Sequence, residues 1–418
     1  MVHSTKKKVE LMAPLKNFKS LNAALNNADA VYFGVESLNM RMFSDNFKLA
    51  NLKKIVSTCH QNNVKAYLTT NVIIYENEIE LTEKILTKAF EAEIDAVIVH
   101  DIGAIELAKS KGLNFHISTQ ANVSNSLSAQ FYQHLGAQRL ILARELSLEQ
   151  IKEIRKKVHT CEIEVFVHGA QCTSISGRCY FSAEICGSQD YSANRGKCIH
   201  PCRRTWKVYD NDNNEFLYDG TFFINTKDLC MIEHIPNLID ANIDAFKIEG
   251  RMRDPIYIEE ATKCYREAID AYFDNTFTPQ RIQEWLFRLK KVYNRGFSTG
   301  FYFGLPTGSE IERDREGNIS DFRKVEIGKV LSYFPEKKAA KILLSKGKLK
   351  LGDRIFIIGT HTDTYFQQEI QSIQIKQKKN LSETPIVSKG HPITVGLLVD
   401  KPVKKNDKIF ILKSKTKP

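Results

Sequence analysis

Five cysteines of this 418-residue chain lie within one stretch of 31 residues: Cys172, Cys179, Cys186, Cys198 and Cys202. The whole chain has nine cysteines. No signal peptide precedes the stretch, and no run of roughly 18 apolar residues occurs, so we expect a cytoplasmic protein with no membrane partner. Thiols stay reduced in that compartment, where a cysteine cluster indicates a metal or iron–sulfur site rather than disulfides.

The spacing of these cysteines favours an iron–sulfur cluster over zinc. Structural zinc sites use short C-x2–4-C knuckles, and only Cys198 and Cys202 have such a spacing. Four thiolates at irregular spacing on loops suit a 4Fe–4S cluster, which needs one ligand at each iron. Nearby positive charge lowers thiol pKa and offsets the charge of a thiolate-bound cluster; it comes from Arg178, Arg195, Lys197, Arg203 and Arg204. Zinc and a set of buried free thiols stay as alternatives.

The chain from residue 9 to about 275 alternates strand-like and helix-like stretches. Amphipathic helices are predicted at 52–63, 81–93 and 147–158, the last with Ser147 as its N-cap. Strict alternation predicts parallel strands with right-handed crossovers, and eight such units fit a closed (β/α)8 TIM-like barrel. A doubly wound open sheet is the alternative, but no G-x-G-x-x-G follows the first strand. The predicted strands are 9–14, 30–35, 64–72, 96–101, 114–119, 139–143, 162–169 and 244–250.

The expected fold class is α/β, with the barrel at residues 1–278 and a cysteine-rich insertion at 169–230. Active sites of such barrels lie where strands end and βα-loops begin. The insertion leaves the seventh predicted strand and is the longest such loop, and loops of this length are often functional. A helix (279–294) and a turn-rich linker follow, together spanning 279–323.

Residues 324–418 have a different pattern, with short strands at regular spacing and Gly or Asn-Asp turns, which predicts a small antiparallel β-barrel. LKLGDRIFI and VKKNDKIFI are similar and predict one strand–turn–strand element used twice. Residues 321–418 hold 21 Lys and Arg against nine Asp and Glu, a net charge of +12, while the whole chain carries +11. A basic domain beside a neutral one predicts a polyanion partner, most simply a nucleic acid. The alternative is that the lysines serve solubility.

Several motifs carry a resemblance to the collagenase-like peptidase family of bacterial proteins, and they run through almost the entire chain. The resemblance implies a barrel enzyme, and characterised relatives are similar to oxygen-independent hydroxylases that hold a 4Fe–4S cluster. The sequence has no G-x-S-x-G, no H-E-x-x-H and no recognised Cys–His protease pattern. The motifs are ELMAP (10–14), DAVYFG (29–34), STQANVSN (118–125), HGAQC (168–172), SGRCYFS (176–182), SANRGKCIHPCR (192–203), TKDLC (226–230) and FKIEGRMR (246–253).

Length and the single basic β-domain make the chain most similar to the branch that hydroxylates tRNA. The resemblance to that branch implies hydroxylation of wobble uridine to 5-hydroxyuridine, with prephenate as co-substrate, tRNA as partner of the basic domain, and iron–sulfur assembly machinery as a further partner. The family also implies the cluster ligands, which match Cys172, Cys179, Cys198 and Cys202. Cys230 in TKDLC is the rival ligand.

Other polar residues are candidates for the reaction site. Lys247, Glu249 and Arg251 alternate with apolar neighbours at the end of the eighth strand, so they share one face. They could clamp an anionic substrate such as prephenate, because Arg suits carboxylates, or form an ion-pair network that fills the barrel. His168 ends the seventh strand, where it serves either catalysis or packing. Further candidates for this pocket are Arg41, Gln120, Asn122 and Arg144.

Three classes of function stay open from the sequence. The favoured one is an RNA-modifying hydroxylase, with ribosomal RNA cytidine or a ubiquinone precursor as other substrates of the same chemistry. The second is a hydrolase, the collagenase-like peptidase of the family name. The third is a non-catalytic iron–sulfur factor that binds RNA and assists another enzyme.

Overall fold

The computed structural model describes residues 8–175, 178–218, 220–375, 379–388 and 390–415. The chain folds into two compact units. The first comprises residues 1–17 and 24–319, and the second comprises residues 18–23 and 320–418. Within the described residues no helix is long and apolar enough to cross a membrane.

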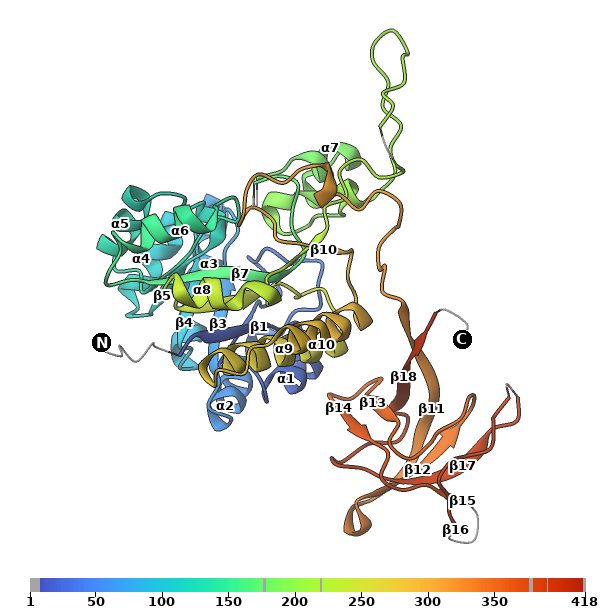
Figure 1. The fold of residues 1–418 in the computed structure, drawn as a ribbon. Coiled ribbons are helices and arrows are strands. Elements are labelled where there is room, and N and C mark those ends of the chain that lie inside the picture. The colour runs from blue at the N-terminus through green and yellow to red at the C-terminus, as the bar shows by residue number, and fades with distance from the viewer. Residues whose placement is uncertain (1–7, 176–177, 219, 376–378, 389, 416–418) are drawn as a thin grey trace. The chain divides into compact units, whose positions relative to one another are not determined.

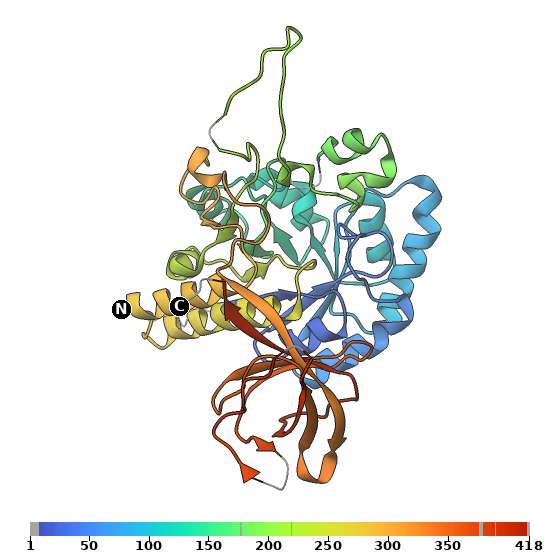
Figure 2. The ribbon, with the colours of Figure 1, turned by 90° about the vertical axis from the view of Figure 1, so that its right-hand side faces the viewer.

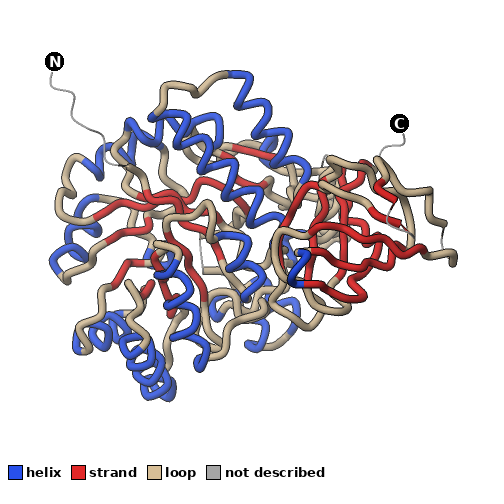
Figure 3. Tube along the Cα trace, turned by 90° about the horizontal axis from the view of Figure 1, so that it is seen from below, coloured by secondary structure: helices blue, strands red, loops and turns tan. Residues whose placement is uncertain are grey.

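The first unit is a closed parallel β-barrel with helices around it (Figures 1 and 3). Each strand pairs in parallel with its neighbour, and β9 pairs with both β7 and β1, which closes the ring. All eight predicted strands are present, so the predicted (β/α)8 barrel is confirmed. The strands of the ring are β1 (Glu10–Pro14), β2 (Ala30–Phe33), β3 (Lys65–Thr70), β4 (Ala96–Val99), β5 (Phe115–Ile117), β6 (Arg139–Ile141), β7 (Glu162–Gly169) and β9 (Ala245–Ile248).

The helices alternate with these strands along the chain. The three helices predicted within the barrel are present, and so is the one at 279–294. Ser147 caps its helix as predicted, since its hydroxyl accepts from the Gln150 N–H while the Gln150 side chain accepts from the Ser147 N–H. The helices of this part of the chain are α1 (Phe18–Ala24), α2 (Leu52–Gln61), α3 (Ile79–Glu91), α4 (Ile102–Ser110), α5 (Ser126–His134), α6 (Leu148–Arg155), α7 (Phe181–Cys186), α8 (Ile235–Asp240), α9 (Pro255–Phe273) and α10 (Pro279–Lys291).

The cysteine-rich insertion follows β7, as the sequence predicts. It holds α7 and short 3-10 turns, and an arm around the antiparallel Tyr209–Glu215 bridge extends away from the rest of the unit (Figure 2). Residues 176, 177 and 219 of the insertion, which include part of the motif SGRCYFS, lie outside the described residues. Two short strands that the sequence did not predict follow it. β8 (Asp228–Cys230) is antiparallel to the end of β7, and β10 (Phe297–Ser298) pairs with β8.

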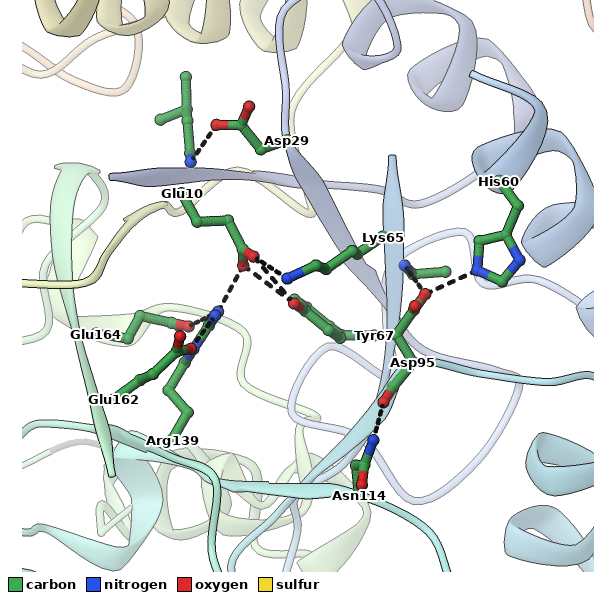
Figure 4. Close-up of polar contacts among 12 residues, drawn as sticks. Glu10, Asp29, His60, Lys65, Tyr67, Asp95, Asn114, Arg139, Glu162 and Glu164 are labelled. Atoms are coloured by element: carbon green, nitrogen blue, oxygen red, sulfur yellow. Dashed lines mark hydrogen bonds and ion pairs between the residues drawn. The ribbon is translucent and has the colours of Figure 1, made fainter. Parts of the chain in front are cut away.

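A buried ion-pair network fills the amino-terminal end of the barrel (Figure 4). Arg139 lies at its centre and contacts Glu10 at 2.6 Å, Glu162 at 2.6 Å and Glu164 at 3.2 Å. Glu164 in turn accepts from the Lys247 ammonium at 2.8 Å. The ion-pair network that the sequence suggested as the alternative to a substrate clamp is therefore present, and Lys247 belongs to it. Buried charges are tolerated only when paired, and here each cation has a carboxylate.

The second unit is an eight-stranded antiparallel sheet around its own apolar core, which includes Ile327, Ile342 and Ile355. Of the predicted repeat, the turn and the strand after it are present twice, before β13 and before β18, but neither turn follows directly on a strand of the described residues. The Lys350 N–H donates to Asp353 and the Lys404 N–H donates to Asp407, each at 2.8 Å. The strands are β11 (Phe322–Phe334), β12 (Ala339–Leu344), β13 (Arg354–Ile358), β14 (Tyr365–Glu369), β15 (Gln374–Ile375), β16 (Lys379–Asn380), β17 (Ile393–Leu398) and β18 (Lys408–Ser414).

The barrel network leads to a stability prediction. Glu164→Gln removes the carboxylate that Arg139 and Lys247 share, which leaves buried positive charge uncompensated. We expect the free energy of unfolding of the barrel to fall by about 3–5 kcal/mol in urea titrations. Glu153→Gln is the matched control, because it breaks the exposed Glu153–Lys156 pair at 2.5 Å, and exposed pairs contribute little. Equal urea midpoints for the two variants would contradict the prediction.

Candidate active site

A cavity opens at the carboxyl-terminal end of the barrel strands, opposite the ion-pair network. It encloses about 420 Å³, its open mouth included. Residues on or just after seven strands line it, as expected for this fold. They include Tyr32 from β2, Thr69 from β3, Ser118 and Gln120 after β5, Arg144 after β6, Phe166 from β7, and Lys247, Glu249 and Arg251 from β9 and the residues after it.

Three arginines and one carboxylate carry the charge of this cavity. Glu249 contacts the guanidinium of Arg41 at 3.0 Å and that of Arg144 at 3.8 Å. Burial alone raises the pKa of the Glu249 carboxyl, but Arg41 and Arg144 outweigh burial and the pKa is lowered overall. Glu249 is therefore a carboxylate at neutral pH. Since Glu164 beneath the cavity already pairs with Lys247, the three arginines leave two positive charges in excess.

Arg251 is the most unusual of these arginines. It is 2% exposed, and it donates to Thr69 Oγ1 at 3.3 Å and to Asn46 Oδ1 at 2.6 Å, both uncharged. Its Nε is buried without a partner. Burial is the main reason that its pKa is lowered to about 10. Gly34 makes room for it, because a Cβ there would lie 2.5 Å from the Arg251 guanidinium. An anionic ligand in the cavity would satisfy this cation.

The structure places some of the other sequence candidates in the cavity and others away from it. Arg41, Gln120 and Arg144 line the cavity together with the β9 residues. Asn122 is not among the lining residues, and it takes a left-handed backbone conformation with φ 51° at the end of a 3-10 turn.

His168 also lies away from the cavity. Its ring stacks on Tyr257 at 5.8 Å, and its Nδ1 lies 3.4 Å from the Tyr265 hydroxyl. Burial lowers its pKa to about 4, so the ring is neutral. These contacts are with α9, on the outer side of the barrel wall, and they are those of a packing residue.

The insertion brings four cysteines into one neighbourhood. Cys198 and Cys202 have raised pKa values, first because they are buried, and in part because Cys172 and Cys179 lie close enough to repel a second negative charge. Cys230 lies elsewhere: it is buried on β8, with its sulfur 3.8 Å from the Tyr265 hydroxyl. Cys186 ends α7, and the remaining thiols, Cys59, Cys161 and Cys264, are buried core residues.

The four neighbouring thiols match in number and type the ligands of a 4Fe–4S cluster, which takes each thiolate at a different iron. Among the described residues, no three His, Cys, Asp or Glu side chains are placed to hold one metal ion. Beside Cys202 lies Arg203, which donates to Asn225 Oδ1 at 3.0 Å and to the carbonyls of Gln171 and Thr226. Because these partners are uncharged, a negatively charged cluster suits this cation.

Two residues of the SANRGKC segment hold the insertion on the barrel. Arg195 pairs with Glu78, donates to the Ile73 carbonyl, and lies over the Tyr75 ring at 4.7 Å. The Gly196 carbonyl accepts from the Met42 N–H at 2.9 Å. The cysteine segment is thereby held on the loops that follow β2 and β3. From the sequence, Arg195 was considered only as a positive charge near the cysteines. Its position inside the longest motif was the one sequence signal that it could have a further role.

Comparison with known proteins identifies relatives along nearly the whole chain. The model described as peptidase family U32 matches residues 16–312. An uncharacterized protease of Methanocaldococcus jannaschii is 42% identical, covering 97% of this chain and 98% of that protein. A collagenase of Porphyromonas gingivalis is 37% identical, with 92% and 96% covered. The tRNA hydroxylation protein P1 of Bacillus subtilis is 32% identical, with 92% and 95% covered.

The docking of the insertion yields a prediction for Gly196→Ala. Gly196 has φ +74°, and a Cβ would lie 2.2 Å from the Asn39 carbonyl oxygen, so the insertion must shift. We expect hydrogen exchange across residues 192–202 to rise at least several-fold. Gly187→Ala is the control: it has a similar φ of +60° in the same insertion, with nothing within 4 Å of the added Cβ. If both variants exchange alike, backbone strain rather than docking is responsible.

Proposed function

The chain belongs to peptidase family U32, and we propose that it is an RNA-modifying enzyme that hydroxylates the wobble uridine of tRNA to 5-hydroxyuridine. Relatives bear names of three kinds: tRNA hydroxylation proteins, collagenases or proteases, and a 23S rRNA 5-hydroxycytidine synthase. One observation supports hydroxylation most: a cavity with two unbalanced positive charges lies at the barrel mouth, on which the segment with four neighbouring cysteines is docked. The Arg41 guanidinium is close enough to Cys172 for a negative charge on this thiol to raise the pKa of Arg41.

The excess charge suits a small dicarboxylate as co-substrate, and prephenate has this chemistry. Arginine binds a carboxylate through paired N–H donors. Arg251 has a free Nε and no carboxylate partner among the described residues, so it would receive one carboxylate. Arg144 already donates to the Ala170 carbonyl at 2.9 Å, which holds its guanidinium beside Glu249.

In this proposal Cys172, Cys179, Cys198 and Cys202 hold a 4Fe–4S cluster. Bound there, the cluster supplies electron transfer. The protein contributes the surroundings: Arg203 offsets negative charge, and the His200 N–H donates to the Cys198 sulfur at 3.3 Å. Hydrogen bonds to the sulfurs and nearby cations are the means by which a protein tunes such a group.

The cavity offers less for a peptidase. No histidine lines it, and Ser118, its one serine, accepts hydrogen bonds from Asn71 at 3.0 Å and from the Gln120 N–H at 3.3 Å. Nucleophilic hydrolysis needs a base within reach of the hydroxyl. The barrel cavity therefore favours the hydroxylase over the peptidase.

We further propose that the second unit binds tRNA through its phosphates. Residues 321–418 of this unit carry a net charge of +12, largely on exposed side chains of strands and turns, among them Lys324, Lys341, Lys404 and Lys405. Phosphate contacts of this kind add affinity without sequence preference. The choice of nucleotide must then come from the barrel.

The cluster proposal predicts the outcome of cysteine substitution. Cys202→Ser should lower the iron content of anaerobically purified protein to a small fraction of the parent value and remove its visible absorption, because serine is a poor ligand for iron–sulfur clusters. Cys264→Ser is the matched control, since Cys264 is a buried core thiol on α9. Full iron in Cys202→Ser would exclude this ligand set, and Cys230→Ser would then be the next variant to measure.

The function itself is tested in tRNA nucleosides. Deletion of the gene from its host should remove 5-hydroxyuridine and its derivatives, measured by mass spectrometry. Complementation with Arg251→Gln should restore about a tenth or less of the modification while iron content stays normal, because a hydrogen bond to a charged group is lost. Arg253→Gln is the control, as Arg253 lies over the Tyr293 ring at 3.5 Å and does not line the cavity. Unchanged 5-hydroxyuridine in the deletion strain would overturn the proposal.

A further inference from the structure

A second, larger cavity adjoins the charged one. It encloses about 780 Å³, its open mouth included. It shares Met40, Asn71 and Gln120 with the inner cavity, so the two cavities lie side by side at these residues. Its outer wall comes from the cysteine insertion through Arg178, Tyr180 and Asn194. Without the open mouth, about 370 Å³ of this space is accessible to a ligand, which lies in the range of pockets that hold one small organic ligand.

We propose that this outer cavity binds one unstacked nucleobase of the RNA substrate, with Tyr180 stacking on the base and Asn194 donating to a base carbonyl. This inference rests on the proposed function and adds the place where the base lies. Enzymes that modify a base must take it out of the stack and into a pocket. Single-stranded bases are then held on aromatic rings and through hydrogen bonds to their edges.

Tyr180 has the properties of a stacking platform. Its side chain is 69% exposed although it lines a cavity. No other ring of the described residues stacks on it, whereas the neighbouring Phe181 packs on Trp206 at 5.4 Å. An exposed aromatic face with no protein partner suits a ligand with a flat apolar face, and a stacked base supplies one.

Asn194 supplies a hydrogen-bond donor with a fixed direction. It is 6% exposed, and its Oδ1 accepts from the Cys179 N–H at 3.0 Å. Its Nδ2 donates to no described residue. Because Oδ1 is held by the backbone, Nδ2 is left as the group for a ligand in the cavity that Asn194 lines. An amide N–H that lines a cavity can donate to a ligand there, and a carbonyl of the base would accept this hydrogen bond.

The charges of the outer cavity also fit a nucleotide. Arg178 is exposed, and no carboxylate of the described residues lies within ion-pair distance of it, so it can contact a backbone phosphate. His100, on the opposite wall, has a pKa lowered chiefly by burial and is uncharged. Positive charge at the rim and neutral polar groups inside match a phosphate outside and a base within. The base would then lie next to the anionic co-substrate in the inner cavity.

Photo-cross-linking tests the proposal without requiring turnover. The probe is a short single-stranded RNA with one 5-iodouridine, irradiated with the iron-loaded, full-length protein. We expect mass spectrometry to map the cross-link to the peptide containing Tyr180. Tyr180→Phe should retain the cross-link, and Tyr180→Ala should lower its yield about tenfold, since stacking contributes most of the contact. Iron content reports whether the cysteine site next to Tyr180 is intact in each variant.

A second variant tests the hydrogen bond. Asn194→Asp keeps an oxygen for the Cys179 N–H and replaces the donor with an acceptor, so the yield with iodouridine should fall at least several-fold while iron content stays normal. Cross-links confined to residues 320–418, or equal yields for Tyr180→Phe and Tyr180→Ala, would overturn the inference. In that case loss of 5-hydroxyuridine in the deletion strain would still support the proposed function. A Tyr180 cross-link with unchanged tRNA nucleosides would instead separate base binding from wobble hydroxylation.

Discussion

The need to pair buried charge governs how this barrel is built. Its amino-terminal end contains Arg139 and Lys65 with Glu10, Glu162 and Glu164 (Figure 4). Lys247 joins them through Glu164, so that three cations meet three carboxylates. A satisfied network of this kind is rigid and closes that end to ligands. Burying these charged groups costs desolvation free energy, which the close contacts between them offset.

At the carboxyl-terminal end of the barrel strands, the buried charges are not fully paired. Arg41 and Arg144 share one carboxylate, Glu249, whereas Arg251 has only uncharged partners among the described residues. A protein that pairs its charges so completely at one end has no structural reason to bury an unpaired arginine at the other. Positions where local rules are broken tend to be functional, and here the missing partner is an anion. In the proposed function, this charge imbalance is what binds the anionic co-substrate.

The cysteine-rich insertion is docked at the carboxyl-terminal end of the barrel, where the cavities open. Arg195 and Gly196 hold it on the loops after β2 and β3, while Arg203 joins both of its ends, through Gln171 on one side and Asn225 on the other. These contacts place the cysteine segment over the loops that line both cavities. Two cavities and four neighbouring cysteines then lie at one end of the barrel, an arrangement that suits the two-substrate oxidation proposed above.

The sequence by itself determined the eight barrel strands, the capped helix at Ser147 and the repeated turn before β13 and β18. Each of these depends on local pattern: apolar runs of strand length, a Ser three residues before Gln, and Asp at a turn. The alternation in FKIEGRMR also placed Lys247, Glu249 and Arg251 on one face, because strand residues alternate regardless of what surrounds them. The cysteine segment stood out for the same reason, as composition is local.

Only the tertiary structure decided which of those residues face a ligand. Lys247 and Glu249 are two residues apart. Lys247 nevertheless pairs with Glu164, whereas Glu249 lies among the cavity arginines. His168 directly precedes the insertion but turns toward α9. Tyr180 and Asn194 were not predicted at all, since their roles depend on contacts between segments far apart in the chain. Burial and charge pairing are set by neighbours in space, and no spacing along the sequence encodes them.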